Sequence, residues 1–190
     1  MYEQFREFGR DLFLRGLISS HGGNMSIRQG DKITITRHGA MLGRLSESDL
    51  LEVGVDEGHE PSNETGGMSP SFDLAAHRAV YQSTDARAIL HAHPPHALAL
   101  SMLEDEIVLV ELEASYLLKR IPVLKLRGIE FYDENARIAI PKALQNHVIV
   151  MVRGHGSYAA GLTLEDAYRW TSTLEENCRI VYLMGSFHPR

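Results

Sequence analysis

Cysteine and long apolar runs are scarce in this chain. Its 190 residues include one cysteine, Cys178, so an internal disulfide is excluded. The start, MYEQFREFGRDLF, lacks the basic stretch followed by an apolar stretch that marks a secretory signal. No apolar run approaches the roughly 20 residues that span a bilayer. These absences predict a cytoplasmic protein with no membrane partner.

The chain also lacks a cluster of basic residues. Lys and Arg number 19 against 25 Asp and Glu, which gives a formal net charge of -6. Nucleic-acid binding needs clustered positive charge to neutralise phosphates, so we expect no nucleic-acid partner. A small phosphorylated substrate stays open, because it requires only a local anion pocket.

No internal repeat or long linker interrupts the sequence. Hydrophobic residues make up 44% and charged residues 23%, the balance of a folded globular protein. We therefore expect residues 1–190 to form a single domain. Residues 56–71, rich in Gly, Glu, Ser and Pro, are expected to be a surface loop of that domain.

Helical and strand patterns mix along the chain without strict alternation. Helical spacing and capping residues predict helices at 2–14, from Ser69-Pro70 to about 82, 96–103, 135–145 and 163–184. Alternating or apolar runs predict strands, the first two forming a hairpin, at 24–28, 32–36, 51–55, 88–93, 107–109, 123–126 and 148–152. This order favours an α/β fold with a mainly antiparallel or mixed sheet and helices on its faces.

The segment Ala88-Ile-Leu-His-Ala-His93 suggests a metal site. Side chains at positions i and i+2 of a strand share a face, so His91 and His93 project together. Two imidazoles on a rigid strand suit a divalent metal, although such a pair also occurs on solvated strand faces. Pro94-Pro95 ends the strand just beyond the pair, which tends to place the site at a sheet edge.

A third histidine strengthens the metal hypothesis. His155 lies in Gly154-His155-Gly156, directly after an apolar strand, and the glycines allow a sharp turn that brings the imidazole close to another group. Three histidine ligands with an open position are typical of catalytic zinc sites, whereas structural sites close with four ligands. We therefore predict that His91, His93 and His155 hold a divalent cation.

Other polar residues are candidates for proton transfer and anion binding. Asp73 and His77 lie one turn apart on the helix expected after Pro70. A carboxylate near a metal can move a proton or coordinate the metal, although Asp in a first turn also stabilises the helix dipole. We interpret His77 as a core residue or as a residue that supports the site without taking part in its chemistry. The turns Gly22-Gly23-Asn24 and Thr36-Arg37-His38-Gly39 suit an anion, although such turns are commonly structural.

Taken in order, these motifs resemble the class II aldolase and adducin family. The resemblance covers nearly the whole chain and rests on Gly16-Leu17, Gly23-Asn24, Pro70-Ser71, His91-Ala92-His93 and Gly154-His155-Gly156. It implies a three-layer α/β/α sandwich around a mainly antiparallel sheet, assembled as a fourfold-symmetric homotetramer. Family members often complete the site across a subunit interface, for which Tyr182 and His188 are candidates here.

The resemblance also implies roles for individual residues. His91, His93 and His155 correspond to the family's zinc ligands, with Mn2+, Co2+ or Fe2+ as alternative metals. Asp73 corresponds to the acid/base Glu. The residues implied in substrate or phosphate binding are Asn24, Arg37, His38, Gly39 and Ser71. In the family's aldolases the metal binds hydroxyl and carbonyl oxygens of a ketose phosphate and stabilises the enediolate formed on carbon–carbon cleavage.

Several departures from the family pattern leave the substrate open. His21 and His38 stand where the anion pocket usually has hydroxyl residues, and Phe72 replaces a serine. The substrate then carries a phosphate bound with different geometry, a carboxylate, or no charged tail. Asp73 is one methylene shorter than the family's Glu, and in the epimerase branch an Asp at this position joins the metal ligands.

The favoured interpretation is a metal-dependent aldehyde-lyase that cleaves a carbon–carbon bond, with decarboxylation or dehydration as close variants. A sugar-phosphate dehydratase competes, because Glu111 and Glu113 lie where that branch has acidic residues. A 4-epimerase needs an acid where this chain has Ser115, next to Tyr116. A non-catalytic adducin-like scaffold is disfavoured, because all three metal histidines are present.

Overall fold

The computed structural model describes residues 1–56, 67–126 and 132–187. The strands in this part of the chain are β1 Asn24–Gln29, β2 Lys32–Thr36, β3 Leu50–Gly54, β4 Ala88–Ala92, β5 Glu106–Val108, β6 Arg120–Leu124, β7 Ile149–Val152 and β8 Gly156–Gly161. The α-helices are α1 Tyr2–Leu14, α2 Leu74–Ser83, α3 Pro95–Leu103, α4 Leu112–Leu117, α5 Tyr132–Leu144 and α6 Leu164–Phe187. Two 3-10 helices, η1 Leu42–Arg44 and η2 Glu47–Asp49, connect β2 to β3.

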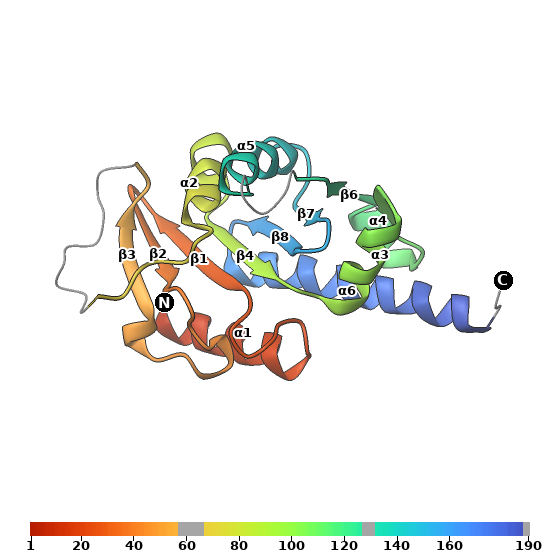
Figure 1. Cartoon of the computed structure of the whole chain (residues 1–190), viewed down its shortest axis with the longest axis horizontal. Coiled ribbons are helices and arrows are strands. Elements are labelled where there is room, and N and C mark those ends of the chain that lie inside the picture. The colour runs from red at the N-terminus through yellow and green to blue at the C-terminus, as the bar shows by residue number, and fades with distance from the viewer. Residues whose placement is uncertain (57–66, 127–131, 188–190) are drawn as a thin grey trace.

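The strands form one mainly antiparallel sheet with helices on both faces (Figure 1). Its order is β3-β2-β1-β4-β8-β7-β6-β5. All neighbouring strands of this sheet are antiparallel except β6 and β7, which are parallel. The expected three-layer α/β architecture is therefore confirmed.

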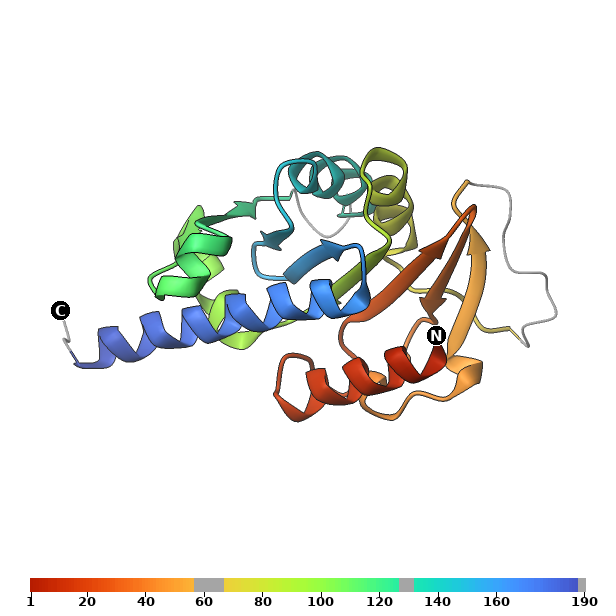
Figure 2. The ribbon, with the colours of Figure 1, turned by 180° about the vertical axis from the view of Figure 1, so that it is seen from behind.

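The sheet separates two hydrophobic cores. On one face α1, α3, α4 and α6 cover a cluster that includes Leu90 and Met151. On the other face α2 and α5 cover a cluster that includes Ile89 and Val150. Successive residues of one strand enter opposite cores, which is why β7 is a continuous apolar run and β4 is apolar apart from His91. Figure 2 shows α6 running along the sheet and projecting beyond it.

Local sequence signals explain several of these elements. β1 and β2 form the expected hairpin, in which Gln29 pairs with Lys32 and Gly30 has a φ of +63°. Ser46 and Asp49 form a capping box at the start of η2. At the start of α6, the Thr163 backbone N–H donates to the Asp166 carboxylate and the Asp166 N–H donates to Thr163 Oγ1. Such reciprocal capping satisfies backbone donors that the helix leaves unpaired.

The predicted start of α2 is wrong. The helix begins at Leu74 and not at Pro70, because Pro70 forms an isolated antiparallel bridge with Arg37. The Ser71 N–H donates to the Thr36 carbonyl at 3.2 Å, so this backbone is used in strand-like pairing. The consequence is that the segment before α2 lies against the end of β2, and Asp73 becomes the residue that precedes the helix.

Two elements, β8 and α4, escaped the sequence prediction. β8 reads GSYAAG, and Gly and Ala are poor strand formers, but it lies between β4 and β7 where sheet packing outweighs propensity. α4 has only six residues, too short for a clear periodic signal.

Most of the loop predicted at 56–71 lies outside the described residues. None of the described helices is both long and apolar enough to cross a bilayer.

Candidate metal centre

Three histidines converge at the carboxyl end of β4. The Nε2 atoms of His91 and His93 are 3.0 Å apart, and ligand nitrogens of these residues and His155 all lie within 4.8 Å of one another. Ligand nitrogens around a tetrahedral zinc ion, at bond lengths of roughly 2.0–2.1 Å, are separated by roughly 3.3 Å. The His91–His93 distance is close to this value, and the cluster as a whole could hold one shared cation. Because β4 lies between β1 and β8, the site is at the end of inner strands and not on an edge strand.

The surroundings of His91 prepare it for coordination. Its Nδ1 lies 2.9 Å from the Ser157 carbonyl, which only accepts, so Nδ1 carries the proton and Nε2 presents its lone pair. Its ring stacks on Tyr158 at a centroid distance of 4.2 Å. Burial lowers the pKa of His91 to about 3, and burial also lowers the pKa of His93 and His155. Near neutral pH all three imidazoles are thus uncharged, the form that binds metal.

The glycines on both sides of His155 allow the three histidines to come close to one another. Gly154 has a φ of +68°, which places it in the left-handed region, and the turn between β7 and β8 depends on it. A Cβ on Gly156 would lie 2.7 Å from His93 Cδ2 and 2.8 Å from His91 Cε1, and would collide with the Ala92 carbonyl oxygen. Only glycine fits at position 156 while the rings keep their positions.

We expect Gly156→Ala to weaken zinc affinity by about 10- to 100-fold, because the added methyl group displaces both neighbouring imidazoles. Competition with a chromophoric chelator measures this change. Gly185→Ala is the matched control, since a Cβ at Gly185 meets no atom within 4 Å. A folded Gly156→Ala variant with wild-type zinc affinity would contradict the geometry.

Asp73 lies beside the cluster. Its Oδ2 is 3.8 Å from His91 Nε2 and accepts a hydrogen bond from Asn24 Nδ2 at 2.6 Å, while Oδ1 accepts one from the Tyr158 hydroxyl at 2.8 Å. Burial raises the pKa of Asp73, but the attraction of its carboxylate to His91 and His77 in their protonated forms, together with these two hydrogen bonds, outweighs burial and lowers that pKa below its usual range. The carboxyl group is therefore ionised at neutral pH. Asp73 makes no side-chain capping bond to α2.

His77, one helical turn after Asp73, belongs to a buried row of hydrogen-bonded side chains. His77 is fully buried, and its Nδ1 lies 2.7 Å from Ser26 Oγ, which is 2.7 Å from the Tyr81 hydroxyl. Burial lowers the pKa of His77 to about 4, so it is neutral. The structure thus places His77 in the core, as interpreted from the sequence.

The residues expected to bind the substrate lie in two groups. Asn24 and Ser71 contact Asp73 directly, since Ser71 Oγ accepts from the Asp73 N–H at 3.3 Å. The Arg37 guanidinium instead donates to the Asp49 carboxylate at 2.7 Å and to the His38 carbonyl at 2.9 Å. Gly39, with a φ of +65°, completes that turn.

The aromatic residues at this turn lie at the protein surface. The His38 ring is 4.0 Å from the ring of Phe72, which is 73% exposed. The anion-binding role of this second group stays a prediction.

Tyr158 is the residue of the site that sequence reasoning missed. Its hydroxyl donates to Asp73 and its ring stacks on His91. It lies on β8, which the sequence did not predict as a strand because the segment is rich in Gly and Ala. The only signal was its position three residues after His155.

Glu111 and Glu113 lie away from the cluster. The Glu111 carboxylate accepts from the Glu113 and Ala114 N–H groups as the cap of α4. Both glutamates line a cavity of about 280 Å³ against α6, together with Arg15. A second cavity, of about 540 Å³, lies where β8 ends, at the end of the sheet opposite to the histidine cluster. Trp170 is among the residues that line it. Neither lining includes a metal histidine.

Comparison with known proteins finds similarity over nearly the whole chain. The family profile described as Class II Aldolase and Adducin N-terminal domain matches residues 3–182. An L-fuculose phosphate aldolase from Methanocaldococcus jannaschii is 30% identical over 95% of each chain. A methylthioribulose-1-phosphate dehydratase from Acidiphilium cryptum is 30% identical over 88% of this chain and 82% of that one. The crystal structure of L-fuculose-1-phosphate aldolase from Thermus thermophilus superposes with a TM-score of 0.89 at 36% identity, covering 98% of this chain and 94% of that one.

Proposed function

The chain belongs to the class II aldolase and adducin family, and from this premise we propose that it is a metal-dependent lyase. Its substrate would be a small ketose phosphate or a related hydroxy-carbonyl compound, in which it cleaves a carbon–carbon bond. The observation that carries the proposal is the convergence of three neutral imidazoles beside one ionised carboxylate.

His91, His93 and His155 would hold the metal. A divalent ion there would act as a Lewis acid on the hydroxyl and carbonyl oxygens of the substrate and stabilise the negative charge of the enediolate. Three protein ligands leave coordination positions for those oxygens. Imidazole donors suit Zn2+, and they also accept Mn2+, Co2+ or Fe2+.

Asp73 would transfer the proton. Its carboxylate takes the proton of the hydroxyl group next to the scissile bond, the carbon–carbon bond breaks, and the bonding electron pair passes to the carbonyl group to form the enediolate. The same carboxyl group then returns the proton to carbon. Asn24 and Tyr158 each bind one oxygen of Asp73, so the carboxylate is held in one orientation.

The remaining substrate contacts would come from the turns around the site. We propose that Asn24 and Ser71 bind polar groups close to the reacting carbons, because both contact Asp73. Arg37, His38 and Gly39 would receive the far end of the substrate. The isolated bridge between Arg37 and Pro70 supports this arrangement, since it joins their turn to the segment that carries Ser71.

Dehydration of a sugar phosphate is the second candidate, favoured by the 30% identity to a dehydratase. Its chemistry needs the same metal and carboxylate but expels a hydroxyl group as water.

Product analysis separates the two reactions. Incubation of metal-loaded protein with ketose phosphates and hydroxy acids should give two carbonyl-containing fragments, detected by NMR or mass spectrometry. A single product lighter by one water supports the dehydratase, and no product from metal-loaded protein contradicts both.

We also propose that the chain assembles as a homotetramer. The ends of α3 and α6 and the helix α4 expose large apolar side chains, namely Met102, Leu103, Leu112, Tyr116, Tyr182 and Met184. Apolar groups gathered at one end of a molecule mark interaction surfaces. His188, the other residue suggested at a subunit interface, lies outside the described residues.

Sedimentation equilibrium should therefore give about four times the chain mass of 21.3 kDa. Leu112→Glu should shift the protein to smaller species, because it puts a charge on a side chain that is 81% exposed in the single chain. Leu162→Glu is the control, an exposed leucine outside this surface. A wild-type chain that sediments as a monomer at all concentrations refutes the tetramer.

A further inference from the structure

We propose that Arg153 is a positioning residue for the metal centre, which fixes the Gly154–Gly156 turn, and with it His155, against the carboxyl end of α3. The inference rests on the proposed function, because it requires that His155 binds a metal. It concerns a residue whose side chain lies outside the histidine cluster.

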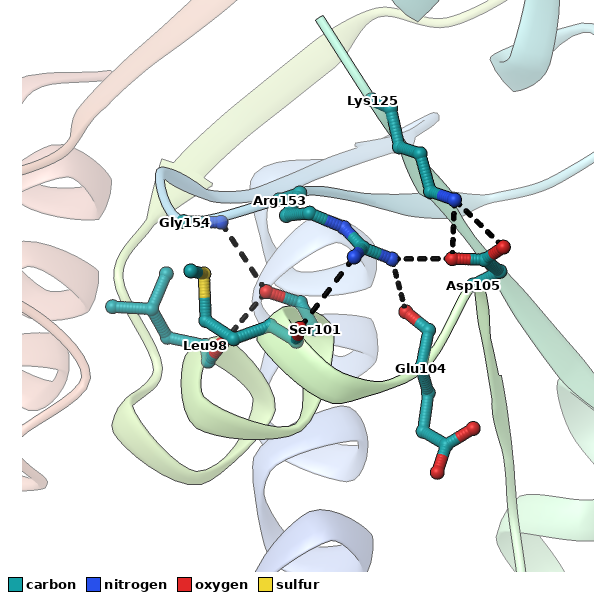
Figure 3. A network of polar contacts seen from close by, with 8 residues as sticks. Leu98, Ser101, Glu104, Asp105, Lys125, Arg153 and Gly154 are labelled. Carbon is teal, nitrogen blue, oxygen red and sulfur yellow. Dashed lines mark hydrogen bonds and ion pairs between the residues drawn. The ribbon is translucent and has the colours of Figure 1, made fainter.

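The Arg153 guanidinium joins the turn to the end of α3 (Figure 3). Its Nη2 donates to the Glu104 carbonyl at 2.8 Å and to Asp105 Oδ1 at 2.5 Å, and Nη1 lies 3.5 Å from the Met102 carbonyl. Carbonyls at the end of a helix lack intrahelical donors and carry the negative end of the helix dipole. A guanidinium at this place satisfies them and holds residue 153 in position.

The backbone of the turn is bound to the same helix. The Gly154 N–H donates to Ser101 Oγ at 3.3 Å, and Ser101, which is fully buried, donates to the Leu98 carbonyl at 2.7 Å. The Arg153 N–H donates to the Leu124 carbonyl of β6 at 3.0 Å. The turn is therefore attached through its backbone and through one long side chain.

His155 depends on this attachment more than the other two histidines do. His91 lies in an inner strand and His93 directly follows it, whereas His155 lies between two glycines, where the backbone has the most freedom. α3 starts two residues after His93, and its other end binds Arg153. The helix thus sets the spacing between the β4 ligands and the turn ligand.

The carbonyl bonds carry more of this effect than the ion pair. Asp105 is 70% exposed and also binds Lys125 at 2.7 Å. Water screens such exposed charge pairs, so their contribution is small. We expect Asp105→Asn to change metal affinity much less than loss of the guanidinium does.

The test compares Arg153→Met with the wild-type chain in two measurements. Chelator competition should show zinc affinity reduced by about 10- to 100-fold, the range for residues that orient metal ligands. Hydrogen exchange of the metal-free protein should be faster in peptides covering the turn and unchanged in β1 and β2. Arg153→Lys should restore part of the affinity, because an ammonium group still donates to the helix carbonyls. Arg120→Met is the matched control, since Arg120 forms an exposed ion pair with Glu106 of the neighbouring strand.

Unchanged zinc affinity in Arg153→Met would overturn the inference even if the turn exchanges faster. The inference would also be overturned if hydrogen exchange rose uniformly along the whole chain and thermal stability fell while zinc affinity stayed complete. That result would show that Arg153 stabilises the fold in general and does not position His155. Failure of the proposed function looks different. In that case the wild type binds zinc and cleaves no substrate, while Arg153→Met still binds zinc more weakly.

Discussion

Replacing His91 with alanine is expected to remove the metal and to lower kcat/KM by on the order of 1000-fold, because a Lewis acid supplies several kcal/mol of transition-state stabilisation. His91 is the most deeply buried of the three proposed ligands, at 2% exposure, and the Ser157 carbonyl fixes its tautomer. The two remaining imidazoles cannot complete a catalytic zinc site. Elemental analysis and steady-state kinetics on the same preparation measure both effects.

Two further variants make this result specific. His91→Gln keeps much of the side-chain volume beside Tyr158, so it should fold and still lose the metal. His147→Ala removes an exposed histidine that lines the cavity at the opposite end of the sheet, and it should keep metal and turnover. A His91→Ala protein with one metal per chain and wild-type turnover would refute the assignment of His91.

Asp73→Asn should lower kcat by about 100- to 10,000-fold while the protein keeps one metal per chain, because it removes a proton-transfer group and no metal ligand. The substitution keeps the shape of the side chain. Asn24 Oδ1 has no hydrogen-bond partner within the described residues, so its amide can rotate to accept from the new amide group. Asp73→Glu retains the charge and should keep more activity than Asp73→Asn.

The same experiment distinguishes the two roles of the carboxylate. Loss of the metal in Asp73→Asn would place Asp73 among the ligands, as its distance of 3.8 Å from His91 Nε2 also allows. Retention of both metal and full turnover would remove Asp73 from the mechanism. Metal content and kcat therefore have to be measured together.

The three histidines of the cluster were predictable because each is marked by a local pattern. His91 and His93 share a strand face through the two-residue period, and the glycines around His155 signal a tight approach. The cap of the helix predicted from residue 163 was equally local and is present. In each case the signal comes from residues within a few positions of one another, although the convergence of His155 with His91 and His93 joins two distant segments.

The contacts that escaped prediction join distant segments. Tyr158 reaches Asp73 across 85 positions, and it does so because β8 pairs with β4 in a register that places Tyr158 opposite His91. The start of α2 moved because Pro70 pairs with Arg37. No local signal marks either pairing, since each depends on tertiary packing. Metal binding by the three histidines, the anion-binding residues, the single domain, the homotetramer and the cytoplasmic location stay predictions.

The measurement that tests the central claim most directly is metal content together with X-ray absorption spectroscopy of the purified wild-type protein. We predict one divalent ion per chain, with three imidazole nitrogens at roughly 2.0–2.1 Å if the ion is zinc. The absence of bound metal after incubation with excess zinc would contradict the metal centre and, with it, the lyase function. A bound metal without imidazole ligands would do the same.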